Sequence, residues 1–172
     1  MDAEFIRTLY DYHYWARDRV LVAAQGLSEE DYARPNGFNY GSLRAILTHA
    51  ASGEAVFLAR WKGEELPPFV TEADLPTLQA LEENWRQSEA KMRAFLATLT
   101  DKDLDREIVS TTRAGDEYRR SLALDMTNVV NHGTQHRSEA AEALTMIGRS
   151  PGNLDLGVYI IQRNAAKAPN FG

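Results

Sequence analysis

The feature that most constrains the fold of this chain is a set of four long segments in which apolar residues recur at α-helical spacing. Each segment has one apolar and one polar face, the pattern of a helix that packs on others along one side. The segments cover residues 2–25, 41–61, 74–99 and 121–147. Gly26 and Gly148 follow the first and the last, as expected at helix ends. Four such helices predict an all-α four-helix bundle, in a single domain over residues 1–172.

Shorter elements are predicted in two of the connections. Ser28 and Asp31 have the spacing of a capping box, which predicts a short helical turn over residues 29–33, with a loop at 34–37. Residues 62–73 form a proline-containing connector. When extended it reaches about 40 Å, the length of a helix of roughly 25 residues. The second and third helices can therefore be parallel and joined by a long crossover.

The region before the last long helix breaks the helical pattern. Residues 107–112 and 117–120 read as two strands, with a glycine-containing turn at 113–116, and predict a small β-hairpin. An isolated hairpin is marginally stable in water, so we expect it to pack on the helices. After Pro151, residues 154–162 predict a short fifth helix or turn, and residues 165–172 are expected to fray.

Composition and charge exclude several classes of function. The chain is 44% hydrophobic and 26% charged, as is usual for a globular protein, and its formal net charge is -6. The acidic balance and the lack of a basic tail disfavour a nucleic-acid partner, because phosphate binding depends on Lys and Arg. No apolar run approaches the ~20 residues of a membrane span, and the acidic start does not resemble a secretory signal. We therefore expect a cytoplasmic protein with no membrane partner.

Cysteine is absent from the chain. Disulfides, thiolate metal ligands and a protein-borne thiol nucleophile are therefore all excluded. Any thiol chemistry would need an external thiol.

Histidine offers the best candidates for chemistry. His132 and His136 are four residues apart in the last long segment, so a helix places both on one face, where they can share one metal ion. His49 lies on the edge of the apolar stripe of the second helix and could supply a third imidazole. Three ligands leave positions open for water or substrate, as an active metal site requires. The alternative is that the pair arises by chance and that each imidazole is a hydrogen-bonded core residue.

Other polar residues are candidates for supporting roles. His13, close to the apolar stripe of the first helix, is either a fourth ligand, an acid/base group or a satisfied core or surface histidine. Three carboxylates could orient the ligating imidazoles, or they could be solvated helix charges: Glu54, Asp125 and Glu139. Arg137 could bind an anionic substrate or pair with a carboxylate such as Asp155.

Four stretches of the chain resemble the DinB family, also described as YfiT-like metalloenzymes. They are GSLRAILTH (41–49), VNHGTQHR (130–137), GRSPGNLDL (148–156) and YDYHYWAR (10–17). The likeness spans nearly the whole chain, and its two histidine motifs are the most specific part. It implies an up-down-down-up bundle and a homodimer. It also implies a divalent metal, most often nickel or zinc, held by His49, His132 and His136. Many relatives have a further histidine where this chain has Gln135, which would change the polar lining of the site.

Relatives with DinB-like folds include transferases and isomerases that act with a low-molecular-weight thiol. The resemblance therefore implies a metal-dependent enzyme that acts on a small molecule, with the catalytic group being water or an external thiol at the histidine site. A dication with neutral ligands can polarise a carbonyl or lower the pKa of bound water or thiol. A metal-dependent hydrolase is the alternative within this class. A non-catalytic, stress-related binding protein is the alternative outside it.

Overall fold

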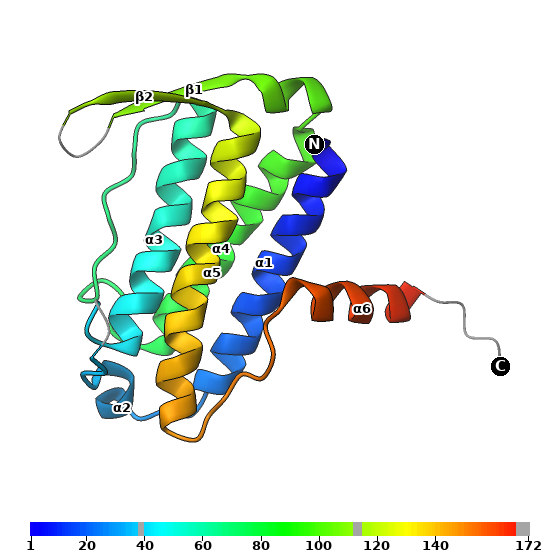
Figure 1. Ribbon diagram of the computed structural model, residues 1–172. Helices are drawn as coiled ribbons and strands as arrows, with labels where there is room; N and C mark the ends of the chain where they lie inside the picture. Colours follow the sequence, from blue (N-terminus) through cyan, green and yellow to red (C-terminus); the bar gives the residue numbers. More distant parts are fainter. Residues whose placement is uncertain (38–39, 112–114, 168–172) are drawn as a thin grey trace.

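Four long helices form the body of the protein. The computed structural model describes residues 1–37, 40–111 and 115–167 (Figure 1). The long helices are α1 (Ala3–Ala24), α3 (Leu43–Lys62), α4 (Leu78–Thr98) and α5 (Leu122–Met146), and the short helix α2 (Glu29–Ala33) joins α1 to α3. The predicted all-α bundle is confirmed, and the helix predicted over residues 29–33 is present at those bounds.

The helices run up-down-down-up, as the family resemblance implies. In Figure 1, α3 and α4 run in the same direction, opposite to α1 and α5. α5 packs on both α1 and α3, and α4 closes the bundle on its other side. The connector between α3 and α4 runs the length of the bundle beside α3. It is held there by Val70, whose N–H donates to Ser52 Oγ, and by an ion pair between Arg44 and Glu72.

Side-chain caps define where the long helices begin. Asp2, Ser42, Thr77 and Ser121 each accept a hydrogen bond from the backbone N–H three residues later, the usual N-cap arrangement. The third long helix was predicted from residue 74, but α4 begins at Leu78. The reason is local: the carboxylate of Asp74 accepts from the Thr71 N–H and closes a separate turn, and Thr77 then caps the helix.

The predicted hairpin is present at one end of the bundle. After a 3-10 turn (Asp101–Asp105), β1 (Glu107–Thr111) pairs antiparallel with β2 (Glu117–Ser121), with Ile108 opposite Arg120. The side chains of Ile108 and Ser110 are buried, so the hairpin packs on the helices rather than standing alone. Residues 112–114, which include part of the predicted turn, lie outside the described residues.

The C-terminal helix is longer than the sequence suggested. The prediction covered residues 154–162 and expected fraying from 165, whereas α6 spans Leu156–Lys167. Contacts with α1 explain the extra length: Tyr159 packs on Tyr12 and Trp15, and Arg163 donates to the hydroxyl of Thr8. Residues 168–172 lie outside the described part of the chain.

The apolar core is divided into two clusters, one toward each end of the bundle. The cluster near the hairpin contains Ile6 and Trp61, and the cluster near α2 contains Leu47 and Trp85. Polar residues lie between the two clusters, near the middle of α1, α3 and α5. A polar layer in the middle of a bundle requires internal partners, and it contains the candidate site.

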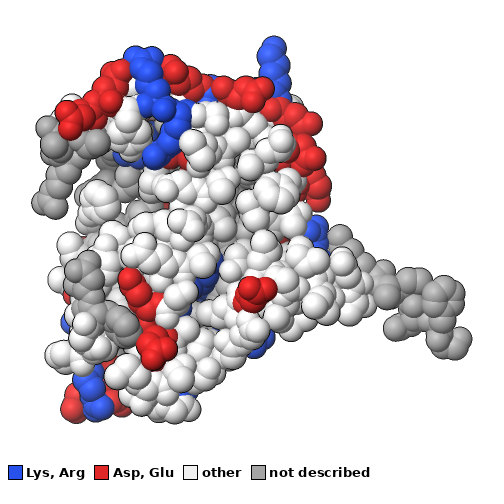
Figure 2. All heavy atoms as spheres, viewed as in Figure 1, with Lys and Arg blue, Asp and Glu red and all other residues white. Residues whose placement is uncertain are grey.

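The surface agrees with the acidic composition. On the face shown in Figure 2, charged side chains are concentrated at the hairpin end, and the middle of the face is mostly uncharged. This face carries no broad basic patch among the described residues. None of the helices in the described ranges combines the length and apolar character needed to cross a membrane.

Candidate metal centre

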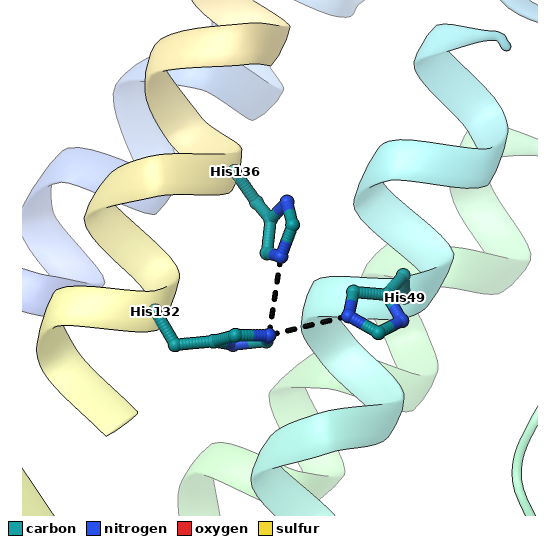
Figure 3. A group of neighbouring side chains, drawn as sticks. All are labelled: His49, His132 and His136. Atoms are coloured by element: carbon teal, nitrogen blue, oxygen red, sulfur yellow. Dashed lines mark hydrogen bonds between the residues drawn. The ribbon is translucent and has the colours of Figure 1, made fainter. Parts of the chain in front are cut away.

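The structure brings the three predicted imidazoles together between α3 and α5 (Figure 3). His132 and His136 lie one turn apart on α5, and His49 faces them from α3. The Nε2 atom of His132 is 3.2 Å from Nε2 of His49 and 3.1 Å from Nε2 of His136. One nitrogen from each ring lies within 4.8 Å of the others. His136 is buried, whereas His49 and His132 are half-buried, so the group lies at the edge of the core. We call these residues the histidine triad.

A glycine on α3 makes room for this approach. A Cβ atom at Gly53 would lie 3.3 Å from Cε1 of His132, which is tighter than most side-chain contacts. The ring of His132 therefore lies against the α3 backbone one turn after His49. The sequence places a small residue at the point where the two ligand-bearing helices must be close.

A carboxylate on α5 orients one of the rings. Nδ1 of His136 lies 2.8 Å from Oε2 of Glu139, one turn along the helix. The carboxylate accepts, so Nδ1 carries the proton, and the lone pair of His136 is then on Nε2, directed at the rest of the triad. A hydrogen bond of this kind is typical of imidazoles that bind metals. Of the three candidate carboxylates, Glu139 is the one in contact with the triad.

The triad cannot satisfy its own hydrogen bonding. A ring nitrogen presents either one proton or one lone pair, and Nε2 of His132 faces two other Nε2 atoms. No assignment of protons completes both contacts. A single cation would satisfy all three lone pairs, and two nitrogens bound at about 2.0–2.1 Å in tetrahedral geometry are separated by roughly 3.3 Å. The observed separations of 3.1 and 3.2 Å fit that requirement.

The electrostatics of the triad favour neutral rings. Burial, together with repulsion from His136 and His49, lowers the pKa of His132 to about 4. Burial and the neighbouring His136 also lower the pKa of His49, although Glu139 opposes the shift. Both rings are therefore neutral at neutral pH. A neutral imidazole is the form that ligates a metal.

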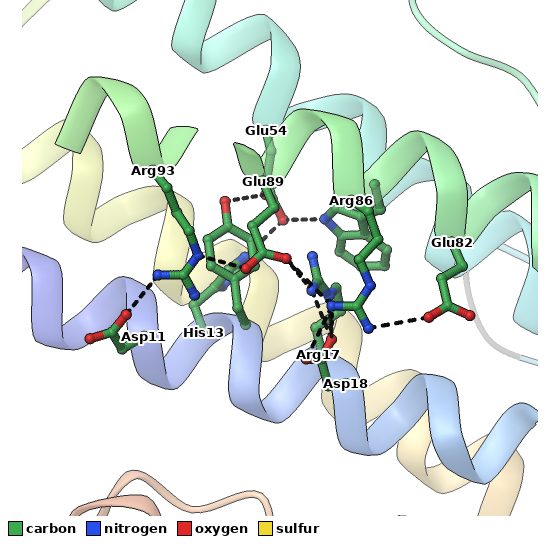
Figure 4. Close-up of polar contacts among 11 residues, drawn as sticks. Asp11, His13, Arg17, Asp18, Glu54, Glu82, Arg86, Glu89 and Arg93 are labelled. Atoms are coloured by element: carbon green, nitrogen blue, oxygen red, sulfur yellow. Dashed lines mark hydrogen bonds and ion pairs between the residues drawn. The ribbon is translucent and has the colours of Figure 1, made fainter. Parts of the chain in front are cut away.

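The fourth histidine lies outside the triad, in a buried network that joins all four long helices. Figure 4 shows His13 and Glu54 of this network. His13 of α1 is fully buried, with Nε2 at 2.8 Å from Oε1 of Glu54 on α3. Its Nδ1 lies 2.7 Å from Nη1 of Arg137 on α5. Trp85 of α4 donates its indole N–H to the same oxygen of Glu54, at 2.7 Å. We call His13, Glu54, Trp85 and Arg137 the four-helix network.

The proton positions in this network follow from the chemistry of arginine. A guanidinium can only donate, so Nδ1 of His13 must accept and Nε2 must carry the proton. That proton is donated to Glu54, whose other oxygen accepts from the hydroxyl of Tyr14. Burial lowers the pKa of His13 and Arg137 adds to this, which outweighs the opposing effect of Glu54. Both ring nitrogens of His13 therefore have a complementary partner.

Glu54 is an ionised carboxylate in the interior. Burial alone would raise the pKa of Glu54, but His13, the hydrogen bond from Trp85 and the charge of Arg17 together hold it below its ordinary value. Arg17 is itself fully buried and pairs with Asp18 and Glu89 (Figure 4). The charges of this layer are balanced by internal partners, as burial of ions requires.

The remaining candidates occupy structural positions. Asp125 is buried near the hairpin, where it accepts from the indole N–H of Trp61 and pairs with Arg120. Arg137 bonds to His13 and to the hydroxyl of Thr134, and no ion pair links it with Asp155 within the described part of the chain. Glu54, Asp125 and Arg137 thus contact groups other than the imidazoles of the triad.

One contact of the site was missed in the sequence. The hydroxyl of Tyr40 lies 2.9 Å from Nε2 of His49, and its ring stacks on that imidazole. Tyr40 stands two residues before Ser42, the N-cap of α3, and this position was the one local signal. Gly53, by contrast, is itself a sequence signal for a close approach one turn after His49, and in the structure the ring of His132 makes that approach.

Fold and site together define a helical-bundle protein with a three-histidine cluster that could hold a metal ion. The comparison with known families agrees: the DinB family profile matches residues 1–165, and the chain belongs to the DinB family. It is also similar to Protein DinB of Bacillus subtilis (strain 168), with 20% identity over 175 residues. That match covers 96% of this chain and 99% of the relative.

Proposed function

We propose that the protein binds a divalent metal ion through His49, His132 and His136 and uses it in a reaction on a small molecule. One observation carries the proposal: three Nε2 atoms from two helices converge, and Nε2 of His132, at 3.1 and 3.2 Å from the other two, cannot form a hydrogen bond with both at once. The lowered pKa values of His49 and His132 support it. Both rings are neutral at neutral pH, so a metal ion can bind them without first displacing a proton.

Several residues of the chain would each contribute to metal binding. The three imidazoles bring no charge, Glu139 holds His136 in the ligating tautomer, and Gly53 lets the ring of His132 lie against α3. Three protein ligands leave coordination positions free for a substrate. A divalent ion at this site would supply Lewis-acid chemistry. Zinc and nickel are our first choices, although imidazole ligands also suit copper and iron.

For the reaction, we favour a transferase that acts with an external low-molecular-weight thiol. The chain has no cysteine, so a sulfur nucleophile would have to come from outside. Hydrolysis of a small substrate is the alternative reaction. A binding protein without catalysis is the alternative class, and it uses the same triad.

Metal analysis of the purified full-length chain, followed by titration with cobalt, tests the proposal. We expect about one equivalent of metal, and a large and similar loss of cobalt affinity in His49→Ala and His132→Ala. Asn131→Ala is the matched control, because Asn131 is the exposed neighbour of His132 on α5. Less than about a tenth of an equivalent after reconstitution would refute metal binding. Equal metal content in His49→Ala and wild type would remove α3 from the site.

The visible spectrum of the cobalt form separates the classes of function. A thiol that changes this spectrum supports the transferase, and turnover of a hydrolysable substrate without thiol supports the hydrolase. A spectrum that responds to neither kind of compound favours the non-catalytic binding protein.

A further inference from the structure

Tyr40 contacts both helices of the histidine triad. Its hydroxyl lies 2.9 Å from Nε2 of His49. Its ring stacks on His49 at 4.3 Å between ring centres and meets the ring of His136 edge-on at 5.1 Å. The tyrosine is half-buried and lies in the connection between α2 and α3. A phenol therefore lies next to the nitrogen that His49 would offer to a metal.

The backbone around Tyr40 is fixed by the beginning of α3. Gly41 adopts a left-handed conformation, with φ of +83°, which residues other than glycine rarely adopt. Its carbonyl accepts a hydrogen bond of 2.9 Å from the N–H of Asn36, and Pro35 forms a β-bridge with Ser42. Ser42 in turn caps α3. Tyr40 thus lies two residues before the N-cap of the helix that carries His49.

The hydroxyl has a definite role to fill once His49 ligates. When the Nε2 lone pair binds a cation, it can no longer accept from Tyr40, and the O–H must find another acceptor close by. A phenol has an ordinary pKa of about 10, so the hydroxyl carries its proton at neutral pH. A protonated hydroxyl beside an open coordination position is a hydrogen-bond donor for whatever binds there.

We propose that the hydroxyl of Tyr40 donates a hydrogen bond to an oxygen or anionic ligand that fills the open position of the triad. The inference rests on the proposed metal function and adds a residue that binds the ligand rather than the metal. It specifies the chemical class of that ligand as a hydrogen-bond acceptor, such as a carboxylate, a carbonyl oxygen or a small anion. Direct ligation by the phenol, or simple competition with the metal for His49, would give different results.

The test compares wild type with Tyr40→Phe, which keeps the stacked ring and removes only the hydroxyl. Cobalt is titrated into each full-length protein, and azide is then titrated into the cobalt form and followed by visible absorption. We expect cobalt affinity to change by less than about threefold and azide affinity to fall about tenfold or more, the effect of one hydrogen bond to an anion. Tyr118→Phe, the same change on the hairpin, should leave both affinities unaltered.

Each other outcome overturns the inference in a distinct way. Equal azide affinity in wild type and Tyr40→Phe means that the hydroxyl does not contact the bound ligand. Weaker cobalt binding in Tyr40→Phe makes the phenol a metal ligand, and tighter cobalt binding makes it a competitor for His49. If wild type itself takes up no cobalt, the proposed function fails first and this inference fails with it.

Discussion

The histidine triad and the four-helix network use the same side chain in opposite ways. Both lie near the middle of the bundle, and both involve α3 and α5. His13 has an acceptor, Glu54, for its one proton and a donor, Arg137, for its one lone pair. His132 instead faces two further imidazole nitrogens. Both ring nitrogens of His13 therefore have a complementary partner, whereas Nε2 of His132 cannot form a hydrogen bond with both neighbouring imidazoles at once.

His13 and His132 show what distinguishes a structural histidine from a candidate ligand. Burial alone points the wrong way, because fully buried His13 is hydrogen-bonded on both sides and half-buried His132 is not. The useful criterion is whether the protein supplies a donor for each lone pair and an acceptor for each proton. Changes in the network should therefore affect stability, and changes in the triad should affect metal binding.

The largest effect is expected from Glu54→Ala. It removes the shared acceptor of His13, Tyr14 and Trp85 and leaves the positive charge of Arg137 without its nearby anion. We expect a loss of about 3–5 kcal/mol in the free energy of unfolding, as when one partner of a buried charged network is removed. Urea unfolding of metal-free protein measures it. Glu83→Ala on the exposed face of α4 is the control, and Glu54→Gln should be intermediate. A stability equal to wild type would contradict the structural role of the network.

Removing a member of the triad should weaken metal binding strongly and change the stability of the metal-free protein little. In His132→Ala we expect metal affinity to fall about 100-fold or more, because one of three ligands is lost. The unfolding free energy of the metal-free protein should change by less than about 1 kcal/mol, since the ring is half-buried and poorly satisfied. Cobalt titration and chelator-treated urea unfolding measure the two quantities. A large loss of metal-free stability would show that His132 is mainly structural.

Substitution of two helical glycines, Gly133 beside the network and Gly53 beside the triad, should also affect stability and metal binding differently. A Cβ atom at Gly133 would lie 2.3 Å from Cε1 of buried His13, whereas one at Gly53 would lie 3.3 Å from Cε1 of half-buried His132. We expect Gly133→Ala to cost about 2 kcal/mol by overpacking. Gly53→Ala should be close to neutral in stability, because its gain in helix propensity offsets the small displacement, and should weaken metal binding instead. Thermal unfolding and cobalt titration of both variants measure these effects. Equal losses of stability and of cobalt affinity in the two variants would show that the network and the triad do not differ in this way.

A smaller effect is expected from Glu139→Ala. Without this carboxylate, His136 loses the partner that holds its proton on Nδ1. We expect metal affinity to fall about tenfold, the lower end for groups that orient a ligand. Glu142→Ala, an exposed carboxylate on the same helix, is the matched control. If both variants bind cobalt equally well, Glu139 does not orient the site.

The smallest effect is a pH dependence. The pKa of His13 is lowered in the folded protein, chiefly by burial, so the unfolded chain binds more protons as pH falls below about 6.5. His13 therefore contributes stability above that pH, which is lost during acidification, by less than about 1 kcal/mol between pH 7 and 6. Urea unfolding at the two pH values measures this loss together with those from His49 and His132, whose pKa values are also lowered. The Cε1 proton of His13 should show no NMR titration in this range, and a normal titration would contradict the neutral assignment.

Local patterns in the sequence predicted much of the fold. Helical periodicity located the four long helices, and the cap at Ser28 located α2 at its observed bounds. The start of α4 was misplaced because Asp74 closes a turn of its own before Thr77 begins the helix. The end of α6 was misplaced because it depends on packing of Tyr159 and Arg163 against α1, a contact between distant segments.

For the site, the sequence by itself determined which imidazoles could meet. The spacing of His132 and His136 follows from helix geometry, and the placement of His49 on a second apolar stripe follows from periodicity. The contacts of His13 with Glu54 and Arg137, and of Tyr40 with His49, become apparent once the helices are packed. The physical reason is that hydrogen-bond complementarity is a property of side chains from different helices. It exists only after those helices pack.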